Sequence, residues 1–346
     1  MTTTPFGSIT LTDDQERRAS ELHRRALVVD GSSVVKHEPE HFERARTGGV
    51  TATNHTVVRP SSEFETAVLE MTSCRHWIDA NADKGLLATT VADIREAKAS
   101  GREAIIFGPQ NTEFIGPDLR KLEAAYVLGV RVLQLTYQRQ NWVGAGCGEQ
   151  VDAGLSTFGR AMVREMDSMG IVVDLSHCGT ETTAQAIEAS ANPVIFSHAH
   201  PYALSPHIRA KSDDLLRALA AKGGVVGITA LSAFLADPAQ PRVRQGLEAF
   251  RRHMDYLINL IGVDHVGIGL DFDETNTPEK FAQDKAAHPE LDTGFGWDDK
   301  RIHGLTHAGE EEQVTRVLVS LGLDDDAVLK VLGGNFLRVF ETVWGS

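Results

Sequence analysis

The sequence predicts an α/β protein in which eight parallel strands alternate with helices as a (β/α)8 barrel. Two apolar runs, Ile171–His177 and Pro193–His198, each end in Ser-His, and fully apolar runs are typical of strands buried on both faces. The stretch between them is long enough for one helix, which makes a βαβ unit. The length of 346 residues suits one such barrel, and a hydrophobic content of 42% suits a large core.

Eight short runs, most of them rich in branched apolar residues, are the predicted strands. They are Ala26–Asp30, Val50–Val58, Ala104–Phe107, Arg131–Leu135, Ile171–His177, Pro193–His198, Gly224–Thr229 and His265–Asp271. The predicted helices are Thr12–Arg25, Phe64–Asp83, Val91–Ser100, Asp118–Leu128, Phe158–Gly170, Thr180–Ala191, Asp213–Lys222 and Arg244–Ile261, with further helices in Gly309–Val343. Gly129 follows the fourth of these helices, as expected of a C-cap residue.

Two segments depart from this alternation. Gln138–Ser156 is a long, glycine-containing connection, and long loops inside compact domains are often functional. Thr275–His303 is rich in charge and in Gly and Pro, and we expect it to be an excursion after the eighth strand. The sequence contains no recognisable domain linker or low-complexity segment, so residues 1–346 are predicted to form one barrel domain.

Composition and charge limit the kinds of binding partner and the cellular location that we expect. The net charge of −14 disfavours nucleic acid and anionic membrane surfaces. No apolar run reaches about 18 residues, and the first residues lack a secretory signal, so neither a membrane span nor export is expected. Cys74, Cys147 and Cys178 show no metal-binding spacing and indicate a reducing, cytoplasmic environment.

The two Ser-His ends are the first candidates for function. In parallel α/β folds, sites form at the carboxyl ends of the strands. His177 and His198 would be delivered there by neighbouring strands and could ligate one metal ion. The alternative, from the residues alone, is a pair of separate hydrogen-bonded histidines.

Several motifs together resemble the renal (membrane) dipeptidase family of zinc peptidases, which are barrels of the metallo-dependent hydrolase type. They are Asp174-Leu-Ser-His177, Pro193-Val-Ile-Phe-Ser-His198, His265-Val-Gly-Ile-Gly-Leu-Asp271-Phe-Asp273, Leu332-Gly-Gly-Asn335-Phe-Leu-Arg338 and Leu128-Gly-Val-Arg131 with Leu135-Thr136. The resemblance implies two zinc ions bridged by a glutamate and a hydroxide, and a homodimer. It assigns His177 and His198 to the second zinc, Asp271 to acid/base catalysis and Arg209 to the substrate carboxylate.

The first-zinc positions depart from the family pattern. Asp30-Gly31 is kept, but Ser32 and Val34 replace the His-x-Asp pair that should follow. Gln110 stands at the bridging glutamate, and Tyr137 stands where a histidine is expected. Valine cannot bind a metal, and a neutral amide bridges two cations poorly. We therefore expect at most one zinc per chain, held by His177 and His198, and a metal-free site remains an alternative.

Three functions stay open. The first is a dipeptidase-like hydrolase acting on a small amide or dipeptide-like acid, with Asp271 moving the proton and Arg209 clamping a carboxylate. The second is a barrel repurposed for non-peptidase chemistry, and the third is a non-catalytic small-molecule binder. The substrate pocket is expected to be lined by polar residues at the strand ends: Arg209, Tyr137, Gln110, Asn111, Ser32, His55 and Asp273. His55, at the end of the second strand, is also a candidate substitute metal ligand.

Overall fold

Eight parallel strands close into a barrel in the order β4-β2-β1-β9-β8-β7-β6-β5. The computed structural model describes residues 9–240, 242–287, 289, 292 and 294–345. The barrel strands are β1 Val28–Val34, β2 Val50–His55, β4 Glu103–Phe107, β5 Val132–Gln134, β6 Val172–Asp174, β7 Ile195–Ala199, β8 Val225–Ile228 and β9 Val266–Ile268. The predicted (β/α)8 barrel is confirmed, with each of the eight predicted strands at its expected place in the chain.

The barrel closes between β4 and β5. Phe107 pairs there with Val130 in parallel, and the Arg131 amide donates to the Phe107 carbonyl at 3.1 Å. Two short strands lie beside the eight. β3 (Gly85–Leu87) pairs with β4, and β10 (Phe272–Asp273) pairs with the end of β1. Neither of these two short strands was predicted.

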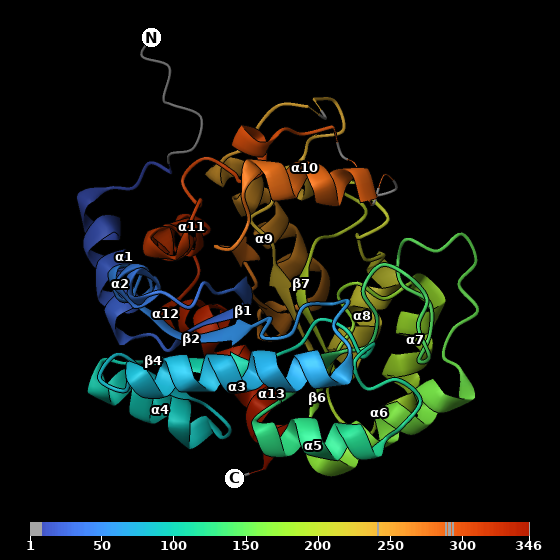
Figure 1. Cartoon of the computed structure of the whole chain (residues 1–346). Helices are drawn as coiled ribbons and strands as arrows, with labels where there is room; N and C mark the ends of the chain where they lie inside the picture. Colours follow the sequence, from blue (N-terminus) through green and yellow to red (C-terminus); the bar gives the residue numbers. More distant parts are fainter. Residues whose placement is uncertain (1–8, 241, 288, 290–291, 293, 346) are drawn as a thin grey trace.

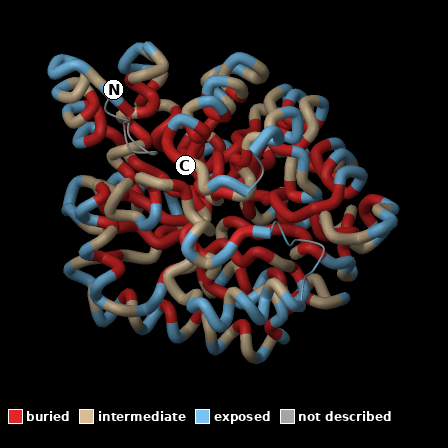
Figure 2. Tube along the Cα trace, turned by 90° about the horizontal axis from the view of Figure 1, so that it is seen from above, coloured by how far each residue is buried: buried red, intermediate tan, exposed pale blue. Residues whose placement is uncertain are grey.

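Helices surround the barrel (Figure 1), and buried segments gather toward the centre (Figure 2). The α-helices are α1 Asp13–Arg25, α2 Pro39–Thr47, α3 Phe64–Ala80, α4 Val91–Ser100, α5 Arg120–Leu128, α6 Thr157–Met169, α7 Thr180–Ala189, α8 Asp213–Ala221, α9 Leu247–Ile261, α10 Pro278–Ala287, α11 Glu312–Ser320, α12 Asp325–Leu329 and α13 Asn335–Trp344. Thr12 caps α1 in a capping box with Gln15, as its sequence favours. α2 and α10 were not predicted, and α10 lies within the predicted excursion.

Helix α13 packs against the ends of the strands away from α10 (Figure 1). Its Phe336 is fully buried and lies so close to Gly31 and Gly267 that a Cβ atom on either would come within 2.8 Å of the ring. The Asn335 amide donates to the carbonyls of Val263 and Val266 at 2.7 and 2.8 Å. The Gly-Gly-Asn-Phe-Leu-Arg motif therefore anchors the final helix against the amino-terminal end of the barrel.

Several strand ends differ from the prediction. β6 was expected to reach His177 but ends at Asp174, because the Asp174 carboxylate accepts the Ser176 amide at 3.1 Å and turns the chain. β9 likewise ends at Ile268 rather than Asp271, and β2 at His55 rather than Val58. The candidate residues His177 and Asp271 thus lie in the turns just beyond β6 and β9, whereas His198 lies within β7, between Ile195 and Ala199. No helix among the described residues is long and apolar enough to cross a membrane.

Candidate active site at the barrel mouth

Two histidine rings meet where β6 and β7 end. The Nε2 atoms of His177 and His198 lie 2.9 Å apart, and Tyr137 stacks on His177 with ring centroids 4.3 Å apart. Burial, and then the charge of Arg209, lowers the pKa of His198 to about 3 and that of His177 well below its usual value. Both imidazoles are therefore neutral near pH 7, which is the form that offers a lone pair to a metal ion.

The ring of His198 is held by a relay that begins at Asp174. The Asp174 carboxylate accepts the Ser197 hydroxyl at 2.6 Å, and the Ser197 Oγ lies 2.8 Å from His198 Nδ1. Because the hydroxyl proton goes to Asp174, Ser197 accepts the Nδ1–H of His198, which leaves the Nε2 lone pair facing His177. Support of this kind is typical of metal-ligating histidines.

Arg209 lies behind the two histidines as a buried cation. Its side chain is only 3% exposed, and its guanidinium donates to the Ser176 carbonyl and to the His198 carbonyl, the latter at 3.3 Å. Among the described residues no carboxylate lies within 4.0 Å of it. Since an unpaired buried charge is costly, this position favours a bound anion.

Lys211 adds a second buried cation to the same wall. Its Nζ donates to the carbonyls of Leu175 and Cys178 at 2.8 and 3.0 Å, and burial lowers the pKa of its amine to about 8. Like Arg209, it has no carboxylate partner within 4.0 Å in the part of the chain that the structure describes. The wall of the site is therefore electropositive.

Asp271 follows β9 with a left-handed backbone, at φ +58°. Its amide donates to the Ser32 carbonyl at 2.9 Å, which links the end of β1 to this turn. Burial raises the pKa of the Asp271 carboxyl, while the nearby charges of Arg301, Lys300 and Arg209 oppose the rise. Non-glycine residues at positive φ are uncommon and concentrate at functional sites.

A second carboxyl, Asp30, lies close to Asp271. Burial, with the added repulsion of Asp271, raises the pKa of Asp30 to about 7 although it accepts the amides of Leu270 and Ser32 at 2.8 and 3.2 Å. Asp273, in contrast, uses its carboxylate within its own loop, accepting the Thr275 amide and hydroxyl at 3.0 and 2.8 Å. Its charge adds to the raised pKa of Asp271. Burial, with smaller contributions from the charges of Asp271 and Asp273, raises the pKa of Tyr137 to about 12.

Ser32 and Gln110 are brought together, as their predicted places at the ends of β1 and β4 require. Gln110 Nε2 donates to Ser32 Oγ at 3.1 Å and to Thr56 Oγ1 at 2.8 Å. Asn111 serves the neighbouring loops instead, donating to the Pro60 carbonyl at 2.8 Å and accepting from Asn141 at 2.9 Å. The amide of Gln110 is therefore oriented by two hydroxyl groups.

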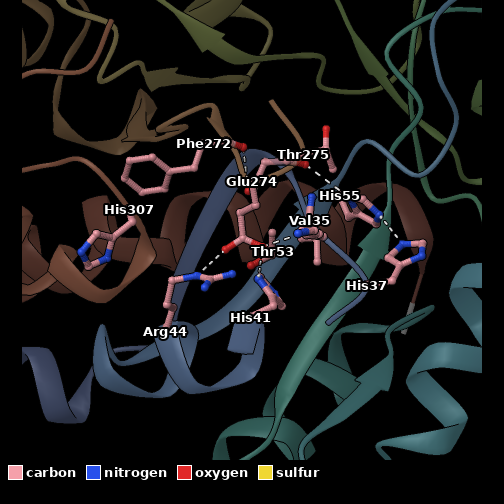
Figure 3. Close-up of polar contacts among 12 residues, drawn as sticks. Val35, His37, His41, Arg44, Thr53, His55, Phe272, Glu274, Thr275 and His307 are labelled. Atoms are coloured by element: carbon pink, nitrogen blue, oxygen red, sulfur yellow. Dashed lines mark hydrogen bonds and ion pairs between the residues drawn. The ribbon is translucent and has the colours of Figure 1, made fainter. Parts of the chain in front are cut away.

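His55, at the end of β2, makes its contacts with the end of β1 and the segment that follows it. Its Nε2 lies 3.3 Å from Nε2 of His37, and its Nδ1 lies 3.1 Å from the Val35 amide (Figure 3). Burial and the charge of His37 lower the pKa of His55 to about 3. The contacts of His55 thus join it to His37, and none of its hydrogen bonds reaches the His177–His198 pair.

The donor set at the mouth fits one metal ion better than two. Three His, Cys, Asp or Glu side chains with ligand atoms within 4.8 Å of one another occur in the described residues only at His37, His55 and Cys74. At the mouth, the two neutral imidazoles alone offer metal-directed lone pairs, and Gln110 presents an N–H₂ group to Ser32. A bridging carboxylate is missing there, so a dinuclear site does not fit these residues.

Four contributors to the mouth were not predicted as site residues: Asp174, Lys211, Arg301 and Thr56. Asp174 stood in a quoted motif, and its position two residues before Ser176 is the signal that could have marked a turn-forming carboxylate. Lys211 and Arg301 lie in loops far along the chain. Only the tertiary structure brings their charges to the strand ends.

Comparison with known proteins identifies related sequences. A family model described as membrane dipeptidase, peptidase family M19, matches residues 17–293. "Dipeptidase aclJ" of Aspergillus oryzae is 34% identical over 255 residues, covering 69% of this chain and 60% of its own. "Dipeptidase tcpJ" of Claviceps purpurea is 29% identical over 265 residues, covering 76% and 56%. The chain therefore spans less than two thirds of the length of either relative.

Solved structures give the same picture of the fold. An amidohydrolase from Pseudomonas aeruginosa is 35% identical, with a TM-score of 0.87 over 95% of this chain and 99% of that one. A metallo peptidase from Rhodobacter sphaeroides, solved with a phosphinate mimic of the dipeptide L-Ala-D-Ala, is 22% identical, with a TM-score of 0.77 over 92% and 99%. The second likeness concerns the fold alone.

Proposed function

The chain belongs to the membrane dipeptidase family, peptidase family M19, and we propose that it hydrolyses a small amide or dipeptide-like substrate bearing a free carboxylate. The observation that carries this proposal is Arg209, a buried guanidinium without a carboxylate partner among the described residues, directly behind the two histidines. A substrate carboxylate supplies the missing anion and fixes the scissile bond relative to His177 and His198. The relatives named dipeptidases support the same reaction class.

Asp271 is proposed to carry the proton. Its raised pKa keeps part of the carboxyl protonated closer to neutral pH than an exposed aspartate would be, which suits a general acid/base. Tyr137 covers one face of His177 and, with the pKa of its phenol raised to about 12, stays protonated as a hydrogen-bond donor. Ser32, Gln110 and His55 remain proposed pocket residues, together with Asn111 and Asp273.

At most one zinc is proposed at the mouth, held by His177 and His198. When bound, this ion would polarise the substrate carbonyl or lower the pKa of a bound water. The second candidate is metal-free, non-peptidase chemistry in the same pocket, or binding without turnover. It is favoured by the donor set at the mouth: in the described residues, no His, Cys, Asp or Glu side chain joins His177 and His198 in a group of three with ligand atoms within 4.8 Å of one another.

The cellular setting is also a proposal. Cys74, Cys147 and Cys178 are not joined to one another in a disulfide, which supports a reducing compartment such as the cytoplasm. The substrate is proposed to be a small molecule. The family resemblance leads us to expect a homodimer. Size-exclusion chromatography with light scattering measures the oligomer directly.

The deciding experiment compares dipeptides that have a free or an amidated carboxyl terminus, assayed with protein of known metal content. Hydrolysis of the free acids, with the amides poorly used, supports the proposal. Equal use of both forms removes the role of Arg209. Absence of turnover across the panel, with zinc supplied, favours the repurposed barrel or the binder.

A further inference from the structure

A second cluster of side chains with metal-binding atoms joins β2, helix α3 and the segment after β1, and the hydrogen bonds of its His55 go to His37, Val35 and Ser33, not to the His177–His198 pair. His37, His55 and Cys74 each offer one ligand atom, and these atoms all lie within 4.8 Å of one another. His55 comes from the end of β2, Cys74 from α3, and His37 from the connection between β1 and α2. Three separate segments thus converge on one point.

From this geometry we infer that His37, His55 and Cys74 bind a zinc-class divalent ion, with a water molecule as the fourth ligand. The Nε2 atoms of the two histidines are 3.3 Å apart. A tetrahedral zinc with Zn–N bonds of about 2.0–2.1 Å requires a separation of about 3.3 Å between two nitrogen ligands. The nitrogen-to-sulfur separation required is about 3.5 Å, so closing the site around Sγ needs a movement on the order of 1 Å.

Metal binding through Nε2 requires the other tautomer of His55. Its Nδ1 lies 3.1 Å from the Val35 amide and 3.4 Å from the Ser33 carbonyl. Without an ion, Nδ1 accepts from Val35, and Nε2–H points to His37. With an ion, the proton moves to Nδ1, the Val35 amide gives up its hydrogen bond to Nδ1, and Nδ1–H donates to the Ser33 carbonyl, which is a common kind of partner for a metal-ligating imidazole.

The ring of His37 is held in place although it is exposed. It stacks on Trp77 with centroids 5.1 Å apart and planes 18° apart, and Trp77 stacks in turn on Phe42 at 4.6 Å. Cys74 and Trp77 are three residues apart on α3 and so face the same side. His37 is therefore a solvent-exposed ligand whose ring is already oriented next to the two buried ligands, His55 and Cys74.

The chemistry of this set is distinct from that of the mouth. Two imidazoles and a thiolate select zinc and similar ions over magnesium or calcium, which prefer oxygen ligands. Burial raises the pKa of the Cys74 thiol, so the apo protein keeps it protonated. A bound cation reverses this effect, because a coordinating thiol is deprotonated outright. Three protein ligands and one open position are the arrangement of reactive zinc sites.

Cobalt(II) tests the inference, since a thiolate ligand gives it a sulfur-to-metal charge-transfer absorption that histidines at the mouth cannot produce. Metal-stripped full-length protein is titrated with Co²⁺, and the same titration is run on His177→Ala/His198→Ala protein. We expect the band in both, with competition by Zn²⁺. Its absence from wild-type protein overturns the inference.

Variants identify the ligands. Cys74→Ser should abolish the band, whereas Cys178→Ser, which removes another buried thiol next to His177, should leave it unchanged. His37→Ala changes an exposed residue and should weaken Co²⁺ binding more than tenfold with the fold intact by circular dichroism. A band that survives Cys74→Ser, or unchanged affinity in His37→Ala, refutes this ligand set whatever the activity at the mouth.

Discussion

At the scale of single residues, the mouth is marked by a concentration of buried ionisable groups. Arg209 and Lys211 are buried cations bonded to backbone carbonyls, while Asp30 and Asp271 are acids whose pKa burial raises. His177 and His198 are kept neutral by the same surroundings. Residues of this kind concentrate at functional sites, because a ligand or a transferred proton completes them.

Arg209→Lys should weaken the use of carboxylate-bearing substrates. The ammonium of lysine lacks the planar fork that makes two hydrogen bonds to a carboxylate, and losing one charged hydrogen bond costs about 1.5–3 kcal/mol. We expect kcat/KM for free dipeptides to fall by about 10- to 100-fold. Amidated analogues serve as the control, since their rates should change little. A uniform loss across both series would instead indicate a general structural effect.

At the scale of elements, the amino-terminal end of the barrel depends on α13. Phe336 is fully buried beneath Gly31 and Gly267, so its removal leaves a cavity that cannot collapse against backbone. Phe336→Ala should lower the free energy of unfolding by about 3–5 kcal/mol, as measured by urea denaturation. Leu69→Ala on α3, where the side chain is 70% exposed, is the matched control and should change it little. Equal effects would contradict the packing role of α13.

A network of ion pairs joins α2 to the barrel and should make the free energy of unfolding depend on pH. His41 on α2 lies 3.0 Å from Glu103 of β4 and 2.9 Å from Glu274, which also accepts Arg44 (Figure 3). Burial alone would lower the pKa of His41, but the charge and hydrogen bond of Glu103, with those of Glu274, raise it to about 10. The folded state therefore binds this proton more tightly than the unfolded state does.

Because that pKa is raised, the stabilisation is fully present below the unfolded value of about 6.5 and declines as the pH rises toward 10. His41→Gln should be less stable than wild type by a few kcal/mol at pH 6, and the gap should shrink by pH 10. Urea denaturation at several pH values measures this. A gap that stays constant over the whole range would mean that His41 is not a bound imidazolium.

At the scale of the whole molecule, the number of metal ions bound per chain tests the prediction that Ser32, Val34 and Gln110 cannot hold a second metal ion at the mouth. The combined variant Ser32→His, Val34→Asp and Gln110→Glu should raise the metal bound at the mouth from at most one ion toward two. The physical reason is that the bridging carboxylate offsets the repulsion between two cations. Ser32 and Gln110 already touch at 3.1 Å, so their replacements come from adjacent positions.

Elemental analysis measures this uptake, and a Cys74→Ser background removes the proposed His37–His55–Cys74 site from the count. Adding His177→Ala and His198→Ala to the combined variant is the control and should reduce the uptake again. Unchanged metal content in the combined variant would show that the strand ends no longer bring these positions to one point.

The sequence by itself determined the order of the eight strands and the end of the barrel at which they deliver polar residues. Apolar runs that stop at Ser-His, Gly-Pro-Gln or Leu-Asp mark buried strands and their exits, and the family resemblance predicted from the same sequence that Ser32, Val34 and Gln110 replace metal ligands. Strand ends were harder to predict, because a side chain such as Asp174 can bond its own turn and stop a strand early.

Only the tertiary structure decided what surrounds those residues. The cations at Arg209, Lys211 and Arg301, the orientation of His198 through Asp174, and the meeting of His37, His55 and Cys74 all join segments far apart in the sequence. Local patterns carry periodicity and turn preference, whereas burial and charge depend on which side chains the closed barrel places beside one another. His55 shows the difference: its place at a strand end was predictable, but its contact with His37 was not.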